Sequence, residues 1–286
     1  MAGEVKYGFV VLHYMAYETT LQCTASLLAL AAPLHVVIVD NASPDGSGAR
    51  LQEHFSQTER VTVLLNPRNE GFARGNNAGY SFLREHFDCA FITVLNNDVL
   101  IPDTQFPQKV AAIYRETPFA VLGPDILNPA SGAHQNPAHL KGFTREQVQE
   151  RLDRYRNNLR HFRWKRFKWK LKRLLRPSPA PQDNTPWQSE ARNVVLHGAC
   201  YVFSRDFIGR REQCFHPGTF LYFEEEILHW ECLRDSLTLL YSPSAQVLHL
   251  EDVSTDKAYR TSAAKERMKL RESVHSMQVF LDLMNS

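Results

Sequence analysis

The sequence lacks paired cysteines, long apolar runs and a strong excess of charge. Its five cysteines are widely spaced and form no CxxC pair, so neither a zinc site nor a disulfide framework is expected. No apolar stretch approaches the length of a membrane span, and the first residues do not resemble a signal peptide. The formal net charge is only +2, which gives no reason to expect nucleic-acid binding. We therefore expect a cytoplasmic protein, with contact to the inner face of the membrane left open.

Two familiar nucleotide-binding motifs are also missing. Residues 69–79 read NEGFARGNNAG, which has neither the spacing of a P-loop nor that of a Rossmann GxGxxG motif. The three glycines would still let a ligand approach the backbone closely near the start of a helix. Alternatively, the glycines only allow tight packing of a helix on a sheet, and Arg74 is a solvated surface charge.

Apolar runs alternate with helical patterns through the first part of the chain. The expected strands are 7–14, 35–40, 61–65, 91–95 and 120–123, and the expected helices are 19–30, 49–55, 72–86 and 103–116. Further strands are expected at 193–203 and 245–249, and a long amphipathic helix at 257–283. Because the early connections are short, the pattern predicts an α/β fold with a doubly wound, mostly parallel sheet.

Polar residues directly follow two of the expected strands. The run FITVL leads into Asn96, Asn97 and Asp98, and the run HVVIV leads into Asp40. Open α/β folds bind ligands at the carboxyl ends of their strands. There Asp98 would be a hard oxygen ligand for Mg²⁺ or Mn²⁺, and Asp40 could accept hydrogen bonds from a base or ribose. Alternatively, these residues only form turns or cap helices.

The middle of the chain is rich in basic and aromatic residues. Residues 151–176 contain twelve Lys or Arg and one acid, Asp153, with Trp164 and Trp169 among them. A helix of this composition is typical of segments that lie on anionic lipid head groups. A solvated helical insertion, or a binder of phosphorylated acceptors, would have the same composition. The proline-rich stretch 177–181 follows as a stiff linker.

Three motifs, taken in order, resemble the family 2 glycosyltransferases with a GT-A fold: DNASPDGS at 40–47, NEGFARGNNAG at 69–79 and LNNDV at 95–99. The resemblance covers about residues 5–125 and resumes in the last third. It implies an inverting enzyme that uses a nucleotide-diphosphate sugar with Mn²⁺ or Mg²⁺, and a smaller antiparallel part on the acceptor side. The opening VVLHYMAYETTLQCTASL is similar to bacterial rhamnosyltransferase-type members, with His13 and Met15 at positions where asparagine is commoner.

The same resemblance implies roles for individual residues. Nucleotide or donor binding is implied for His13, Asp40, Asn41, Ser43, Asp45, Gly71, Arg74, Asn76, Asn77, Asn96 and Asn97. Metal binding is implied for Asp98 and His249, and an acceptor-side position for His197, Gly198 and Ala199. Only the last residue of LNND is acidic where the family has its DxD motif, so the phosphates of the nucleotide would supply much of the metal coordination. His249 and His197 could equally be structural histidines.

Three acids at 224–226 follow the aromatic run TFLYF. An inverting transfer needs a base that deprotonates the acceptor hydroxyl. The run resembles the family's Tyr-Phe-Glu-Asp segment, which puts Glu225 at the Asp position, so Glu225 is the first choice for the base and Glu224 the second. Alternatively, the acids occupy the first turn of a helix because the helix dipole favours them there.

The expected organisation is a nucleotide-sugar-binding half at 1–125, a basic insertion and linker at 126–192, an acceptor and catalytic half at 193–256, and a C-terminal helix at 257–286. The predicted activity is metal-assisted, inverting sugar transfer to a glycan or lipid-linked glycan of the cell envelope. The resemblance favours a deoxythymidine- or uridine-diphosphate donor, with rhamnose as a candidate sugar. One alternative is a nucleotidyltransferase, although residues 13–19 lack its glycine-rich basic loop. The other is a non-catalytic relative that binds nucleotide sugars or lipid.

Overall fold

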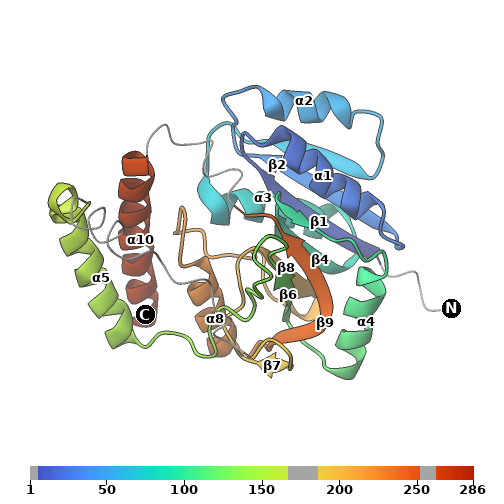
Figure 1. The fold of residues 1–286 in the computed structure, drawn as a ribbon. Coiled ribbons are helices and arrows are strands. Elements are labelled where there is room, and N and C mark those ends of the chain that lie inside the picture. The colour runs from blue at the N-terminus through green and yellow to red at the C-terminus, as the bar shows by residue number, and fades with distance from the viewer. Residues whose placement is uncertain (1–5, 167–185, 252–261) are drawn as a thin grey trace.

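A mixed β-sheet with helices on both faces forms the centre of the protein (Figure 1). The computed structural model describes residues 6–166, 186–251 and 262–286. The strands are β1 (Lys6–His13), β2 (Leu34–Asp40), β3 (Val61–Leu65), β4 (Cys89–Asn96), β5 (Val99–Leu100), β6 (Val121–Leu127), β7 (Ala191–Arg192), β8 (Cys200–Ser204) and β9 (Leu239–His249). The helices are α1 (Tyr17–Leu28), α2 (Ser47–His54), α3 (Gly71–His86), α4 (Phe106–Glu116), α5 (Arg145–Arg160), α7 (Arg205–Ile208), α8 (Glu224–Arg234) and α10 (Ser262–Met284).

The strands are ordered β3-β2-β1-β4-β8-β6-β9-β5, and β7 pairs with β9. The first four in this order are parallel to one another. β8 is antiparallel to both β4 and β6, and β9 is parallel to β6 but antiparallel to β5 and β7. The predicted α/β class, with a parallel part and an antiparallel part, is confirmed.

One predicted strand is shorter than expected. The apolar pattern assigns residues 193–199 to the strand that ends near Phe203, but β8 begins only at Cys200. Asn193 has a left-handed backbone (φ 55°), which turns the chain away from β7. Beyond it, Val195 makes only an isolated bridge to His139. The apolar run here is buried as a loop, and apolar sequence alone does not distinguish a buried loop from a buried strand.

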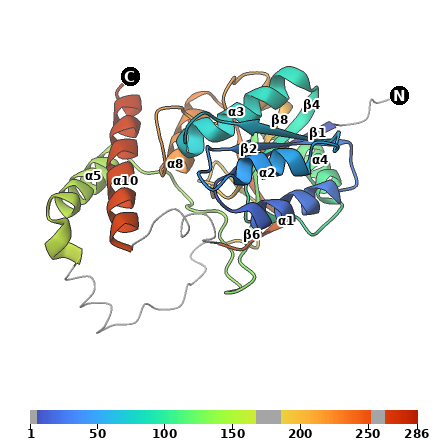
Figure 2. The same ribbon diagram turned by 90° about the horizontal axis from the view of Figure 1, so that it is seen from above.

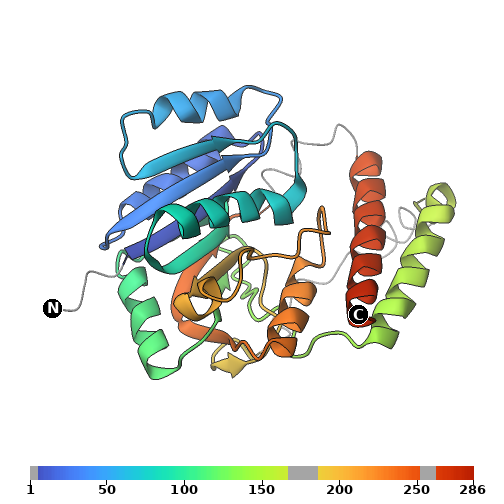
Figure 3. The same ribbon diagram turned by 180° about the vertical axis from the view of Figure 1, so that it is seen from behind.

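Each face of the sheet buries an apolar core. Phe9 and Ile38 lie in the core that includes residues of α1, α2 and α4, whereas Val10 and Val39 lie in the core that includes residues of α3, α7 and α8. This alternation follows from the two-residue period of a strand. Because both faces are covered, the parallel strands read as continuous apolar runs. Figure 2 shows α1 and α2 on one side of the sheet and α3 on the other, and Figure 3 shows α3 in front.

The helices α5 and α10 lie side by side at one end of the molecule (Figures 1 and 2). Val148 of α5 and Phe280 of α10 share a small core with Ile227 of α8. The basic segment therefore begins as a helix whose apolar side is covered by α10. Residues 167–176 of that segment, the proline-rich stretch 177–181 and residues 257–261 lie outside the described residues. Among the helices of the described ranges, none is long and apolar enough to cross a membrane.

Candidate active site

Asp40 fixes the loop that follows β2. Both of its carboxylate oxygens accept the backbone N–H of Ser43, at 3.3 and 3.2 Å. The Ser43 hydroxyl in turn accepts the N–H of Met15 at 2.9 Å, which ties the loops after β1 and β2 together. A Cβ atom on Gly48 would collide with the Asp40 carboxylate, so α2 can start this close to the strand end only with glycine there. Asp45 lies exposed in the same loop and accepts the N–H of Ser47 at 3.1 Å.

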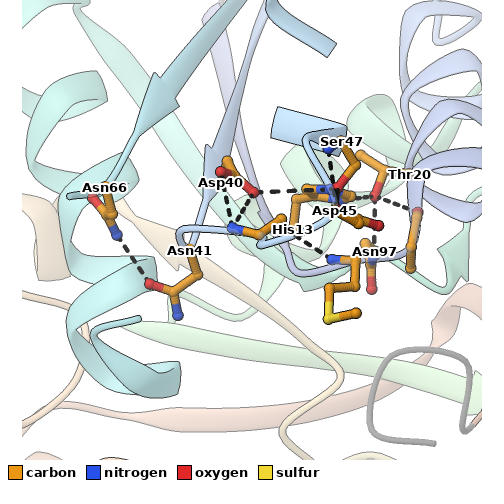
Figure 4. Close-up of polar contacts among 11 residues, drawn as sticks. His13, Thr20, Asp40, Asn41, Asp45, Ser47, Asn66 and Asn97 are labelled. Carbon is orange, nitrogen blue, oxygen red and sulfur yellow. Dashed lines mark hydrogen bonds and ion pairs between the residues drawn. The ribbon is translucent and has the colours of Figure 1, made fainter. Parts of the chain in front are cut away.

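Asn41 shapes the loop between β3 and α3. Its side-chain oxygen accepts from Asn66 Nδ2 at 3.1 Å (Figure 4). The same oxygen accepts from the Glu70 N–H at 2.9 Å. Its Nδ2 donates to Asn69 Oδ1 at 3.0 Å and to the Gly71 carbonyl at 2.9 Å. Through these four hydrogen bonds, Asn41 holds the loop between β3 and α3 in place.

A chain of buried polar side chains runs beneath the loops (Figure 4). His13 is fully buried, with Nδ1 2.7 Å from the Thr20 hydroxyl and Nε2 2.8 Å from the Ser47 hydroxyl. The Thr20 hydroxyl also accepts from Asn97 Nδ2 at 3.0 Å. His13 and Asn97, both predicted to contact the donor, are thus directed into the interior, where they link the first loop to the polar end of β4.

Polar residues of α3 connect the helix to the segment that precedes α8. Asn77 exchanges two hydrogen bonds with the backbone of Phe215, at 2.8 and 2.9 Å, and Arg74 Nε donates to the Pro217 carbonyl at 2.8 Å. Asn76 donates to the Phe72 carbonyl, but its buried Oδ1 has no hydrogen-bond partner among the described residues. Of the predicted donor-binding residues of α3, Asn76 is therefore the one that keeps an acceptor for a ligand.

Gly71 brings the start of α3 against Phe220. It has φ +78°, and a Cβ atom there would collide with the Phe220 carbonyl oxygen. The same carbonyl accepts the Phe72 N–H at 2.7 Å. The glycine-rich loop is therefore joined directly to the segment that leads to Glu224.

Asp98 and His249 face each other across two paired strands. Val99 pairs with His249 in the β5–β9 ladder, and the Leu250 N–H donates to the Asp98 carbonyl at 2.9 Å. Asp98 Oδ1 lies 3.3 Å from His249 Nε2. This Oδ1 is buried and otherwise accepts no hydrogen bond from the described residues.

The Asp98–His249 pair fits a divalent cation. Adjacent ligands of an octahedral Mg²⁺ or Mn²⁺ ion, with bonds of about 2.1 Å, lie about 3 Å apart. The observed separation of 3.3 Å is close to that value, and the pair offers one carboxylate and one imidazole. The described ranges contain no group of three or more His, Cys, Asp or Glu arranged around one metal position. These two residues would therefore hold an ion only together with donor phosphates or water.

The predicted acceptor-side residues lie next to this pair. The Ala199 carbonyl accepts the Asn96 N–H at 2.9 Å, so His197, Gly198 and Ala199 are placed opposite the end of β4. The rings of His197 and His249 are 5.8 Å apart. Burial, followed by the neighbouring His249, lowers the pKa of His197 to about 4, so its ring is neutral at pH 7.

The acids of 224–226 begin α8, in agreement with the alternative that they occupy the first turn of a helix. Burial raises the pKa of Glu225, which accepts a backbone hydrogen bond from Gly198. Burial and the charge of Glu225 raise the pKa of Glu224, and likewise that of Glu226, to about 8. Tyr222 and Phe223, just before the helix, have φ of 73° and 70°. Consecutive left-handed residues other than glycine are strained, and such strain is concentrated at functional sites.

A pocket of about 420 Å³ adjoins this segment and is lined by Phe220, Arg271, Glu272 and His275. His275 Nε2 lies 3.0 Å from the Gly218 carbonyl, so α10 holds the segment before α8 in place. No sequence pattern marks this pocket, because α10 reads as an ordinary amphipathic covering helix.

Gln135 also lies near the site, and no sequence pattern singles it out. It lies in the connection after β6, and its Oε1 is 2.8 Å from Nδ1 of His249. Its Nε2 donates to the carboxylate of Glu251. A lone glutamine in a polar, proline-containing stretch carries no motif that could have marked it.

Comparisons with known proteins bear on the family and the fold of this chain. Residues 9–176 match the family described as Glycosyl transferase family 2. A comparison with curated proteins found no match.

Solved structures share the fold at low sequence identity. The mannosyltransferase PcManGT from Pyrobaculum calidifontis, in complex with GDP-Man and Mn²⁺, is 12% identical with a TM-score of 0.56, over 96% of this chain and 71% of that one. TarS 1–349 of S. aureus is 12% identical with a TM-score of 0.56, over 93% and 64%. GalNAc-T7 with UDP, GalNAc and Mn²⁺ is 14% identical with a TM-score of 0.54, over 87% and 44%. At such identities the likeness shows the fold alone. The family match covers more than half of the sequence, and the chain belongs to glycosyltransferase family 2, with the GT-A fold.

Proposed function

We propose that the protein transfers a sugar from a nucleotide-diphosphate donor to an acceptor hydroxyl with inversion at the anomeric carbon. The observation that carries this proposal is the position of residues 197–199, which contact both Glu225 and Asn96, the last residue of β4 and two residues before Asp98. The candidate base and the chain just before Asp98 are thus both hydrogen-bonded to one short segment. An inverting transfer needs these two functions close together.

The donor nucleotide would lie over the ends of β1, β2 and β4, with the loop between β3 and α3 beside it. Asp40 would accept hydrogen bonds from the base or ribose, and Asn76 Oδ1 would accept one from a sugar hydroxyl. The structures of PcManGT and GalNAc-T7 contain GDP-Man and UDP respectively, which supports a nucleotide sugar as the donor class. A deoxythymidine- or uridine-diphosphate donor, with rhamnose as a candidate sugar, stays a prediction.

Asp98 and His249 would hold Mn²⁺ or Mg²⁺ together with the donor diphosphate. A bound divalent ion neutralises the charge that develops on the departing diphosphate. Both PcManGT and GalNAc-T7 were solved with Mn²⁺, which supports this choice of ion. Within the protein, Asp98 supplies the anionic ligand and His249 the imidazole.

Glu225 would take the proton from the acceptor hydroxyl. Its burial raises its pKa, which makes the carboxylate a stronger base than an exposed glutamate, and the Gly198 N–H orients it. Glu224 has an unpaired buried Oε1 and a pKa raised to about 8, so it is mostly protonated at pH 7 and less suited to this role.

The acceptor would be a glycan or a lipid-linked glycan. We place one of its sugar rings in the pocket beside Phe220, where an aromatic ring and the Arg271–Glu272 pair supply an apolar face and polar groups. Arg160, Arg163 and the 57% exposed Trp164 lie near the end of the described basic segment and would contact an anionic membrane surface. In this proposal, the nucleotide-sugar-binding half is 1–125 and the acceptor and catalytic half is 193–256. The basic insertion and linker is 126–192, and the C-terminal part is 257–286.

A panel of nucleotide sugars with Mn²⁺ tests the proposed function. We expect one donor to raise the melting temperature and to be hydrolysed slowly or transferred to a glycan. A thermal shift without turnover would instead indicate a non-catalytic relative. Release of pyrophosphate from a nucleoside triphosphate and a sugar phosphate would indicate a nucleotidyltransferase. Absence of hydrolysis, transfer and thermal shift with all donors would contradict the proposal.

A further inference from the structure

Four side chains form a continuous chain that ends at the candidate metal pair. The carboxylate of Glu251 accepts from Gln135 Nε2, Gln135 Oε1 contacts His249 Nδ1 at 2.8 Å, and His249 Nε2 faces Asp98 Oδ1 at 3.3 Å. Gln135 is itself fixed to the sheet, because its backbone N–H donates to the Ile126 carbonyl of β6 at 2.8 Å. The backbone of Gln135 is therefore held in a fixed position beside His249.

The order of donors and acceptors fixes the proton on His249. An ionised carboxylate only accepts, so Glu251 turns the amide of Gln135 with its NH₂ outward and its oxygen toward His249. An amide oxygen also only accepts, so His249 Nδ1 must carry a hydrogen. In a neutral ring the remaining lone pair is then on Nε2, the atom that faces Asp98.

This placement leaves two buried acceptor atoms in contact. The Nε2 lone pair and the Asp98 Oδ1 atom repel each other unless a positive charge lies against both, and the two side chains are only 9% exposed. A divalent cation supplies that charge. The Gln135 oxygen keeps the hydrogen on Nδ1 and so leaves Nε2 to the ion.

We propose that Gln135 is a positioning residue that holds His249 in the tautomer and orientation needed to bind a divalent cation through Nε2. The inference rests on the proposed metal-assisted function and adds a residue to it. Partners of this kind typically change metal affinity by about 10- to 100-fold when they are removed.

The direct test measures Mn²⁺ affinity, in the presence of UDP, by electron paramagnetic resonance of free Mn²⁺. We expect Gln135→Leu to weaken binding by about 10- to 100-fold. Gln246→Leu is the matched control, because Gln246 lies on β9 and donates to Asp125 at 2.8 Å without contacting His249. The double variant Gln135→Glu/Glu251→Gln reverses the outer hydrogen bond but keeps an acceptor on His249 Nδ1, and it should retain wild-type affinity.

Two further measurements separate a positioning role from loss of folding. In a His249→Ala background, Gln135→Leu should weaken Mn²⁺ binding no further. Nitrogen-15 chemical shifts of the metal-free protein should show His249 protonated at Nδ1 in the wild type, and a mixture of tautomers in Gln135→Leu. Wild-type affinity in Gln135→Leu, an equal loss in Gln246→Leu, or an unchanged tautomer would overturn the inference. Failure of the proposed function looks different, since the wild-type protein would then bind no Mn²⁺ while the tautomer measurement would still report on Gln135.

Discussion

The backbone of Gly198 lies directly against the carboxylate of Glu225, so closely that a Cβ atom at position 198 would stand 2.5 Å from Oε1. The next residue, Ala199, accepts the Asn96 N–H at 2.9 Å, so the candidate base is fixed relative to the end of β4. Residues 198 and 199 therefore link the candidate base to the strand end beside the candidate metal pair. Glycine is required here for space, since φ at this position is not positive.

We expect Gly198→Ala to lower kcat by roughly 100-fold, because the added methyl group must displace the Glu225 carboxylate by a large fraction of an ångström. Donor affinity should stay near that of the wild type, because Asp40 and Asn76 do not contact this position. Steady-state kinetics measure the fall in kcat, and donor titrations check that donor affinity is unchanged. An unchanged kcat would mean that the position of Glu225 does not limit the reaction.

Glu225→Gln should reduce transfer by roughly 10²- to 10⁴-fold, the usual contribution of a general base. A glutamine keeps the size and the Gly198 hydrogen bond of the side chain but cannot accept the acceptor proton. Binding of the nucleotide sugar, followed by thermal shift, should persist. Glu226→Gln serves as the control on the same helix turn and should keep most activity. Full turnover in Glu225→Gln would move the role of base to Glu224.

The contribution of Glu224 to stability should fall as the pH rises from about 4.5 to 8. The pKa of Glu224 is raised from 4.5 to about 8 by burial and by Glu225, so the folded state binds more protons than the unfolded state in this window. This contribution is therefore fully present below pH 4.5 and is lost as the pH rises through 8. Glu224→Gln cannot ionise, and its free energy of unfolding should decline less steeply in urea titrations from pH 5 to 9. An equal slope in both proteins would contradict the burial of this carboxyl group.

Gly71→Ala should destabilise the protein more than Gly132→Ala does. Both glycines have positive φ, +78° and +72°, and forcing alanine into that region costs about 1–2 kcal/mol. Only at position 71 would the Cβ atom also collide with a carbonyl oxygen, that of Phe220, whereas position 132 has nothing within 4 Å. Urea unfolding of the two variants isolates the effect of the collision. Equal losses would show that the loop and the Phe220 segment move apart easily.

Replacing exposed arginines near the end of the described basic segment should weaken binding to anionic vesicles. We expect Arg160→Glu/Arg163→Glu to lower the affinity for phosphatidylserine-containing vesicles by roughly tenfold or more, because each basic residue near such a surface contributes attraction. Arg192→Glu/Arg210→Glu makes the same change in net charge on other exposed positions. If both double variants lose affinity equally, binding depends on net charge and not on this segment.

Local patterns allowed the first half of the fold to be predicted closely. β3 was predicted with its observed bounds, and β1, β2 and α3 within one residue at either end. The apolar runs of the strands and the helical spacing of α3 are patterns among residues that are close in the sequence. The insertion of β8 between β4 and β6, and the loop at 193–199, depend on pairing with distant residues, which a single sequence does not reveal.

The site was predicted unevenly for a related reason. Asp40 ends β2 and Asp98 follows β4 by two residues, and the continuous apolar runs before them predict both positions. Asn41, Asn77 and His13 have residue types that suit a ligand. In the structure, however, their side chains form hydrogen bonds with backbone or side-chain groups of the protein itself. Residue type does not tell which side of a turn a side chain faces. Gln135 is significant only through contacts with His249 and Glu251, which are far away in the sequence.

The strand order also constrains how the chain assembles during synthesis. β6 pairs only with β8 and β9 among the described strands, and β5 pairs only with β9, so both strands are made long before their partners. The four parallel strands can associate as soon as β4 leaves the ribosome, but β6 must wait with unpaired edges. A nascent chain that stalls before residue 200 therefore leaves the apolar segment VLGPDIL without its strand partners, and unpaired strand edges of this kind favour aggregation.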